Sequence, residues 1–273
     1  MGWEDSFRLR DENGVPYGIP NANKKPRVSS MPYGYDIAEG YISGHSSFMK
    51  IGYNADIGTA EEDLWTVGGV FVPPTAAMQM EVVSSSADDK SDGTGIRKVI
   101  IYYLDSSGLS QSEEVTSNGT TAVATVATDI TFINGFRAVT TGTGLRAAGN
   151  IDIRHLDDTP IYSRIQAGYT RARNINYKVP ADKNLYITSY VVGVYGATKG
   201  IRFAARTTYD GIAQATRDFF LPQAEITMTN GVFERFLELP TKVPAGNRLK
   251  ISGVADQAGA VCSCAIRGWL EDV

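Results

Sequence analysis

The sequence contains few of the residue types that most often perform catalysis or bind metal ions. Only two histidines and two cysteines occur among its 273 residues. These side chains supply many of the general bases, thiolate nucleophiles and transition-metal ligands of proteins, so their scarcity argues against a catalytic or metal centre. We expect a protein that is not an enzyme and that uses no cofactor.

Long apolar runs and an excess of positive charge are also missing. No uninterrupted apolar stretch approaches the roughly 20 residues that a membrane-spanning helix requires. The formal net charge is −4, which disfavours a general nucleic-acid-binding surface. The first residues, Met1-Gly-Trp-Glu-Asp5, are acidic where a secretory signal is basic and then apolar. We expect a protein made in a reducing cytosol, with neither a membrane nor a nucleic acid as its partner.

The two cysteines, Cys262 and Cys264, lie two positions apart on a predicted strand. Alternation along a strand puts both thiols on the face that carries Ile266 and Leu270. A disulfide between such close neighbours is geometrically awkward, and the chain has no second cysteine pair to complete a metal site. We therefore expect two free, buried thiols.

Glycine is abundant, with 28 residues, and it accompanies many Thr, Val, Tyr and Ser residues, a mixture that favours strands and turns. From residue 68 onward apolar residues alternate with a period of two between clusters of turn residues. The fold class we predict is all-β, with two β-sandwich domains of jelly-roll or immunoglobulin-like type. The predicted strands are 78–83, 97–104, 110–115, 122–126, 130–139, 151–154, 162–167, 175–179, 185–195, 201–207, 219–221, 233–239, 249–254 and 261–270.

A break at Leu156-Asp-Asp-Thr-Pro160 separates these strands into two sets. We assign residues 1–65 to an extended arm with one possible short helix, 66–156 to a first sandwich and 157–273 to a second. A Val-Pro corner recurs at Lys178-Val-Pro-Ala181 and Lys242-Val-Pro-Ala245, with a fainter copy at Val72-Pro-Pro74. Proline has no N–H for the sheet ladder and so ends a strand, and the motif predicts strand corners whether it arose by duplication or as a recurrent turn.

The N-terminal segment differs from the rest, because four of the eleven prolines lie within residues 1–32 and no apolar period persists there. We predict an extended arm that lies on a neighbouring subunit. The basic residues of this arm are nearly balanced by Glu4, Asp5, Asp11 and Glu12, which disfavours phosphate binding. The residues expected to make the assembly contacts are Trp3, Phe7, Arg8, Arg10, Tyr17, Lys24, Lys25, Arg27, Tyr33 and Tyr35.

The strongest helical signal in the chain is Thr59-Ala-Glu-Glu62, which fits a capping box and predicts a short helix up to Trp65. In a capping box the glutamate reaches back to the backbone at the start of the helix. This places the possible short helix at the end of the arm.

Four features of the sequence are candidates for sites of chemistry. Gly44-His-Ser-Ser47 resembles part of a nucleophile elbow, but position 48 is Phe where glycine is required, so we expect His45 to be a hydrogen-bonded loop histidine. We expect His155 to cap the connection after a strand. Glu113 and Glu114 are adjacent on a predicted strand and must point to opposite faces, which excludes direct cooperation between them. The loop Asp88-Asp-Lys-Ser-Asp-Gly93 lacks the spacing of an EF-hand, so we expect a solvated turn and leave open whether Asp88 to Asp92 bind a cation.

The predicted strand 185–195 is apolar on both faces. Simple alternation puts Tyr186, Tyr190, Val192 and Val194 on one face and Ile187, Val191 and Tyr195 on the other. A strand that is apolar on both faces is buried on both sides, which indicates that the outer face meets another chain.

The stretch from Ser43 to His155, about 40% of the chain, resembles virion proteins of tailed bacteriophages. The similar segments include Ser43-Gly-His-Ser-Ser47, Glu81-Val-Val-Ser-Ser-Ser-Ala87, Tyr103-Leu-Asp-Ser-Ser-Gly108 and Ala148-Gly-Asn-Ile-Asp-Ile153. The resemblance implies a non-enzymatic structural protein that is present in many copies in a virion assembled in the host cytoplasm. It transfers no catalytic residues.

Within this resemblance we expect a capsid-surface decoration or head-fibre protein that binds copies of itself, as a trimer or higher homo-oligomer, and other virion proteins of the capsid or tail. A tail, collar or baseplate component is the alternative within the same class. A receptor- or glycan-binding module is the alternative from another class, because tyrosine, with 14 residues, is abundant enough to build a contact surface.

Overall fold

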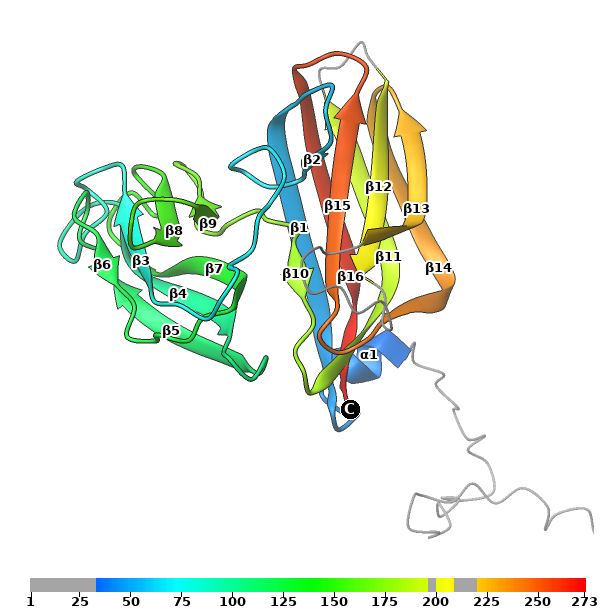
Figure 1. Cartoon of the computed structure of the whole chain (residues 1–273), viewed down its shortest axis with the longest axis horizontal. Helices are drawn as coiled ribbons and strands as arrows, with labels where there is room; N and C mark the ends of the chain where they lie inside the picture. The colour runs from blue at the N-terminus through cyan, green and yellow to red at the C-terminus, as the bar shows by residue number, and fades with distance from the viewer. Residues whose placement is uncertain (1–32, 196–199, 209–219) are drawn as a thin grey trace, which may run out of the picture.

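The computed structural model describes residues 33–195, 200–208 and 220–273. In these ranges the chain forms one short helix and sixteen strands, and all the strand pairs are antiparallel (Figure 1). The predicted all-β class is confirmed. The elements are α1 (Tyr33–Ala38), β1 (His45–Ile57), β2 (Glu62–Asp63), β3 (Met80–Ser84), β4 (Ile96–Leu104), β5 (Ser110–Thr116), β6 (Val123–Ala124), β7 (Phe132–Thr141), β8 (Ile151–His155), β9 (Ile161–Ile165), β10 (Tyr177–Lys178), β11 (Lys183–Tyr195), β12 (Ile201–Thr208), β13 (Phe220–Met228), β14 (Gly231–Val243), β15 (Arg248–Ala255) and β16 (Ala260–Asp272).

Two of the four sheets enclose the larger core, and we call this part the large unit. One sheet has the strand order β1-β16-β11-β14, and the other has the order β10-β15-β12-β13 with β2 added to β15. Side chains from both sheets fill the space between them, among them Ile57, Ile187, Phe203 and Ile251. The burial of these apolar side chains is the main force that holds the two sheets together.

The other two sheets form what we call the small unit, which lies beside the large unit (Figure 1). Their strand orders are β6-β3-β8-β9 and β5-β4-β7. A second core that includes Met80, Ile101, Ile153 and Tyr162 lies within this unit. A third, smaller cluster joins Leu104 and Phe132 of the small unit to Trp65 and Phe71 in the segment that leads to it.

The course of the chain between the units differs from the predicted division into arm, first sandwich and second sandwich. β1 pairs with β16 from His45 opposite Glu271 to Ile57 opposite Ala260. Residues 45–63 therefore belong to the large unit, although the sequence assigned them to the arm. The small unit is an insertion between β2 and β10.

The pattern of β1 explains why alternation did not reveal it. Glycine and asparagine, Gly52 and Asn54, occupy buried positions, while the apolar Met49 is exposed on the opposite face. A Cβ atom on Gly52 would lie against the carbonyl oxygen of Leu64 and 2.8 Å from Cys264 Sγ. Only glycine fits here, so the close packing leaves no room for the apolar side chain that a period of two would place at this position.

The predicted helix over Thr59 to Trp65 is absent from the structure, and Glu62 and Asp63 form β2 on the edge of β15 instead. The Glu62 carboxylate does reach back, as a capping box requires. It accepts hydrogen bonds from Gly58 N at 2.9 Å, Gly69 N at 2.9 Å and Asn54 Nδ2 at 3.1 Å. The prediction was wrong because these donors belong to a loop and a neighbouring strand, so the same carboxylate closes a loop.

The Val-Pro motif marks corners, as predicted, at two of its three positions. Val179 and Pro180 lie between β10 and β11, while Val243 and Pro244 end β14 before β15. Each corner carries the chain from one sheet of the large unit to the other. The two corners are hydrogen-bonded to each other, from Val179 N to Asn247 O at 2.8 Å and from Gly246 N to Val179 O at 3.0 Å.

The assignment of faces along β11 was partly wrong. The register of β11 against both β14 and β16 shifts between Ile187 and Ser189. This β-bulge puts Ile187 in the core together with Tyr190, from which simple alternation had separated it. Tyr186 faces outward and stacks on Trp269, with 5.4 Å between the ring centroids.

Among the described residues, no helix is both long and apolar enough to cross a membrane.

We predict that Gly52→Val lowers the free energy of unfolding by about 3 kcal/mol, because the added side chain must displace the Leu64 backbone or the Cys264 thiol. Urea unfolding of the purified chain measures this loss. Met49→Val on the same strand is the control, because Met49 is 56% exposed and should change stability little. Equal stability of the two variants would contradict the integration of β1 into the large unit.

Candidate functional site

Most of the predicted assembly residues lie outside the described part of the chain. These are Trp3, Phe7, Arg8, Arg10, Tyr17, Lys24, Lys25 and Arg27. Tyr33 and Tyr35 are described, and they lie in helix α1 where an extended arm was predicted. The Tyr33 ring meets Trp269 of the same chain edge-on, with 5.2 Å between centroids. Tyr33 therefore packs on its own chain, while a contact of the arm with a neighbouring subunit stays a prediction.

Both histidines are held by local hydrogen bonds. His45 Nδ1 donates to the Ser43 carbonyl at 2.9 Å, and its Nε2 accepts from the Tyr33 hydroxyl at 3.0 Å. The expectation of a hydrogen-bonded histidine is confirmed, although His45 begins β1 and does not lie in a loop. His155 Nδ1 accepts from Asp157 N at 3.1 Å and so caps the connection after β8, as predicted.

The acidic loop after β3 is built around a buried carboxylate, so the expectation of a solvated turn was wrong for Asp89. Its two oxygens accept hydrogen bonds from the Ser84 hydroxyl, Ile96 N, Ala148 N and Gly149 N at 2.7–3.0 Å. These donors come from three segments of the small unit, which the carboxylate ties together. Because protein donors already surround it, Asp89 has a structural role in the fold.

The remaining sequence candidates have structural roles. Glu113 accepts from Val126 N and Ala127 N, while Glu114 faces the other way and pairs with Lys98 at 3.0 Å, which confirms the predicted opposite faces. Cys262 and Cys264 are free and buried, also as predicted. Burial raises the pKa of the Cys262 thiol to about 12, which keeps it protonated and unreactive. In the described ranges, no group of three or more His, Cys, Asp or Glu side chains is placed to hold a metal ion.

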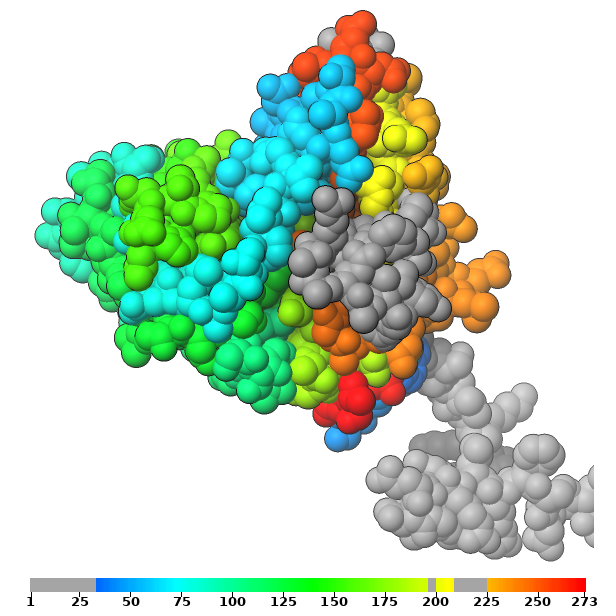
Figure 2. Space-filling view, viewed as in Figure 1, coloured from blue at the N-terminus to red at the C-terminus, as the bar shows by residue number. Residues whose placement is uncertain are grey.

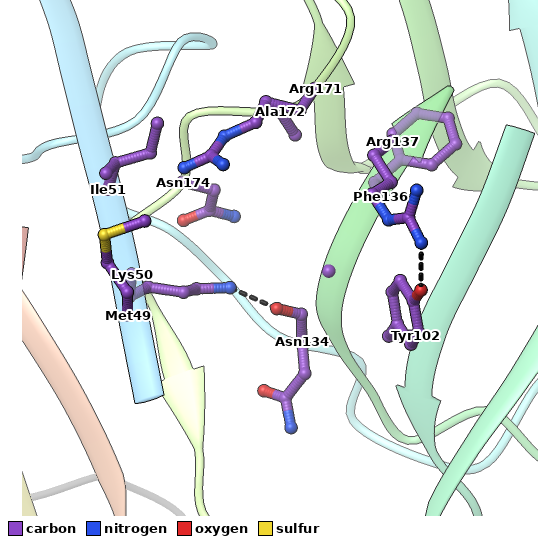
Figure 3. Close-up of a pocket in the computed structure, with 11 residues that line it drawn as sticks. Met49, Lys50, Ile51, Tyr102, Asn134, Phe136, Arg137, Arg171, Ala172 and Asn174 are labelled. Carbon is purple, nitrogen blue, oxygen red and sulfur yellow. Dashed lines mark hydrogen bonds between the residues drawn. The ribbon is translucent and has the colours of Figure 1, made fainter. Parts of the chain in front are cut away.

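A basic cleft that the sequence did not predict lies at the junction of the two units (Figure 3). It has a volume of about 190 Å³. Lys50 enters it from β1 of the large unit, Arg137 from β7 of the small unit, and Arg171 from the connection between β9 and β10. Tyr102, Asn134 and Asn174 complete the polar lining, and no Asp or Glu is among the described residues that line it.

Backbone pairing brings the two arginines together. Residues 170–172 run antiparallel to β7, with hydrogen bonds from Ala138 N to Thr170 O at 2.7 Å and from Ala172 N to Phe136 O at 2.8 Å. Arg137 and Arg171 are directly opposite each other in this bridge. The bridge pairs the backbones, and Figure 3 shows the Arg171 side chain on the Lys50 side of the cleft and the Arg137 side chain beside Tyr102.

Lys50 and Arg137 each make further contacts with residues beside the cleft. The Lys50 ammonium group donates to the Asn134 carbonyl and lies 5.6 Å from the centre of the Tyr177 ring. The Arg137 guanidinium donates to the Tyr102 hydroxyl at 2.7 Å. Burial, together with the positive charge of Arg171, lowers the pKa of Lys50 to about 7.

A second surface feature is the exposed apolar part of β14, the end strand of its sheet. Residues 237–240 lie opposite the single residue Thr188, because Thr241 pairs with Ile187 and Phe236 pairs with Ser189. The segment therefore bulges from the sheet, and we call residues 236–240 the β14 projection. Figure 2 shows the orange β14 segment standing out from the surface. Phe236 and Leu239 are 71% and 84% exposed, and Val232 on the same strand is 76% exposed.

Sequence reasoning missed both features for the same reason. Lys50, Arg137 and Arg171 are far apart in the sequence, and only the pairing of β1 with β16 and of residues 170–172 with β7 brings them together. The one local signal is Arg171-Ala-Arg173, a basic pair without an adjacent acidic residue. The β14 projection depends on a register shift that alternation cannot reveal.

No protein-family model matches the chain, and no curated protein matches it either.

The lowered pKa of Lys50 predicts a specific dependence of stability on pH. Between pH 7 and the ordinary lysine pKa, the unfolded chain binds a proton at Lys50 that the folded chain lacks. The free energy of unfolding should therefore rise with pH above 7, by at most about 1.4 kcal/mol per pH unit. The groups that face Lys50 are Arg171, whose charge is constant here, and Tyr177, whose pKa is raised by burial.

Lys50→Met should remove this contribution. Urea unfolding of both proteins at pH 6.5, 7.5 and 8.5 tests it, because pH effects from other groups are common to both. We expect the stability of the variant relative to the wild type to be highest at pH 6.5 and to decline as the pH rises. A constant difference would show that Lys50 keeps an ordinary pKa.

Proposed function

We propose that this protein is a non-enzymatic structural protein that works by assembly, as a component of a tailed-phage virion located on the capsid surface as a decoration or head-fibre protein. The observation that carries the assembly part is the exposed apolar β14 projection. The resemblance of residues 43–155 to phage virion proteins supports the location. In this proposal the two pairs of sheets are β-sandwiches of jelly-roll or immunoglobulin-like type.

In a monomer, the exposure of the apolar side chains of the β14 projection to water is unfavourable in free energy. Single exposed apolar residues are common on protein surfaces, but a cluster of large ones on one strand marks an interaction site. Val232, Phe236 and Leu239 lie within eight positions of one strand, and each is more than two-thirds exposed. Covering them would gain roughly 1.5–3 kcal/mol for each side chain that becomes fully buried.

A second copy of this chain is the partner we propose for this surface. The bulge interrupts the regular edge of β14, which disfavours open-ended strand addition and favours a contact through side chains. Beside the projection Glu234 is paired with Arg267 at 2.9 Å. The charged residues of β14 are Glu234, Arg235, Glu238 and Lys242, two of each sign, so the strand carries no net charge that would repel an identical strand. Homo-oligomers with closed symmetry are the commonest way to bury such a patch.

The alternatives are separated by position in the particle and by ligand. A tail, collar or baseplate component would use the same assembly surface at another place in the virion. A glycan-binding module has one observation in its favour, a mostly apolar hollow of about 390 Å³ whose lining includes Tyr53, Tyr195 and Asn230. Aromatic faces beside an amide are suited to sugar rings, and saturable binding on a glycan array would favour this alternative.

We predict that Leu239→Asp reduces the oligomer to monomers while leaving the thermal unfolding midpoint of the monomer unchanged, because Leu239 is exposed within one chain. Sedimentation velocity at micromolar concentration gives the oligomeric state. Val126→Asp is the matched control, since Val126 is 86% exposed on the small unit. A wild-type chain that is monomeric at 100 µM, or a Leu239→Asp variant that still forms the oligomer, would contradict assembly through the β14 projection.

We also predict that a chain beginning at residue 33 is folded but fails to join particles, because eight of the ten proposed arm contacts lie within residues 1–32. The truncation stops there because α1 and β1 belong to the described fold. Co-sedimentation of full-length and truncated chains with particles measures incorporation, and a cryo-electron-microscopy map of the particle gives the position. Normal incorporation of the truncated chain would contradict the role of the arm.

A further inference from the structure

The basic cleft has the features of a site for an anion. Lys50, Arg137 and Arg171 line one hollow in a protein whose net charge is −4, and no Asp or Glu is among the described residues that line it. The Arg137–Arg171 backbone bridge places both arginines at this hollow. The positive charge of Arg171 acts on Lys50, and a counter-charge in the hollow would offset that repulsion.

The donors of these groups are only partly used by the protein. An ammonium group has three N–H donors and a guanidinium group has five. Lys50 donates to the backbone carbonyl of Asn134. Arg137 donates to the Tyr102 hydroxyl and to the backbone carbonyl of Ala138. Figure 3 shows Lys50 and Arg171 entering the hollow from one side and Arg137 standing on the other. Donors thus remain on both sides of a space of about 190 Å³.

We propose that this cleft binds an oxyanion of about the size of phosphate, held by Lys50, Arg137 and Arg171. Guanidinium groups recognise the oxygens of phosphate and carboxylate groups through paired, charge-assisted hydrogen bonds. A volume of about 190 Å³ holds such a group together with a few water molecules, each of which takes about 30 Å³. The oxyanion is a free inorganic ion or a carboxylate that a binding partner presents.

The bound anion would join the two units. Its ligands come from β1 of the large unit, from β7 of the small unit and from the connection between β9 and β10. A ligand that binds only when these elements are in place stabilises the folded chain according to its concentration. The inference stands on the cleft alone and does not depend on the proposed function.

The test is the thermal unfolding midpoint at pH 7 and constant ionic strength, with inorganic phosphate raised from 0 to 20 mM. For a dissociation constant near 1 mM we expect a rise of about 3 °C in the wild type. Arg171→Gln should abolish this rise, and without phosphate its midpoint should equal or exceed that of the wild type, because the repulsion between Arg171 and Lys50 is relieved.

Lys98→Gln is the matched control, because it removes one positive charge from an exposed ion pair on β4 outside the cleft. It should keep the full response to phosphate. Calorimetric titration in buffers of different ionisation heat adds a second readout, since an anion beside Lys50 should bind together with a proton. Arg137→Gln replaces Arg171→Gln if the latter does not fold, with the same expected loss.

The outcomes are distinct. A larger response to phosphate than to acetate supports a site for a free tetrahedral ion, while an equal or larger response to acetate supports a site for a presented carboxylate. A response that is the same in wild type and Arg171→Gln shows general screening and overturns the proposal. Absence of both a midpoint shift and a heat of binding in the wild type overturns it as well.

Discussion

The antiparallel pairing of β1 with β16 is the interaction on which the rest of the structure depends. It runs from His45 opposite Glu271 to Ile57 opposite Ala260 and so closes the large unit with strands from distant parts of the chain. Because β1 and β2 are held in the large unit, the chain must leave it for the small unit and return at β10. The same pairing places Lys50 at the junction and gives helix α1 a surface, through Tyr33 on Trp269.

The two units are joined by polar as well as apolar contacts. Asn134 of β7 accepts from Lys178 N at 3.0 Å and donates to Lys178 O at 2.8 Å, so its side-chain amide pairs with β10 much as a neighbouring strand would. The Arg248 guanidinium lies over Phe71 and Phe132, with 5.9 Å and 5.5 Å to the ring centres. Positive charge therefore lies beside the small apolar cluster of Trp65, Phe71, Leu104 and Phe132, while the two larger cores stay within their units.

The sheet β1-β16-β11-β14 connects the two surface features of the protein. Its β1 edge faces the small unit and carries the basic cleft, while its β14 edge is open and carries the apolar projection. The two edges suit different partners, because a cleft lined by cations attracts an oxyanion and exposed apolar side chains favour contact with another apolar surface. Assembly through β14 would leave the cleft at the opposite edge of the sheet.

The sequence by itself determined the features that depend on neighbouring residues. Alternation between turn clusters located the strands from β3 to β16, although the predicted strand 219–221 covers only the start of β13. The Val-Pro motif located two corners, and the spacing of Cys262 and Cys264 placed both thiols in the core. Only the tertiary structure decided that β1 belongs to the large unit, that Glu62 closes a loop, and that Lys50, Arg137 and Arg171 line one cleft. Each of these depends on a partner far away in the sequence, and the buried Gly52 removes the local apolar signal just where the packing is closest.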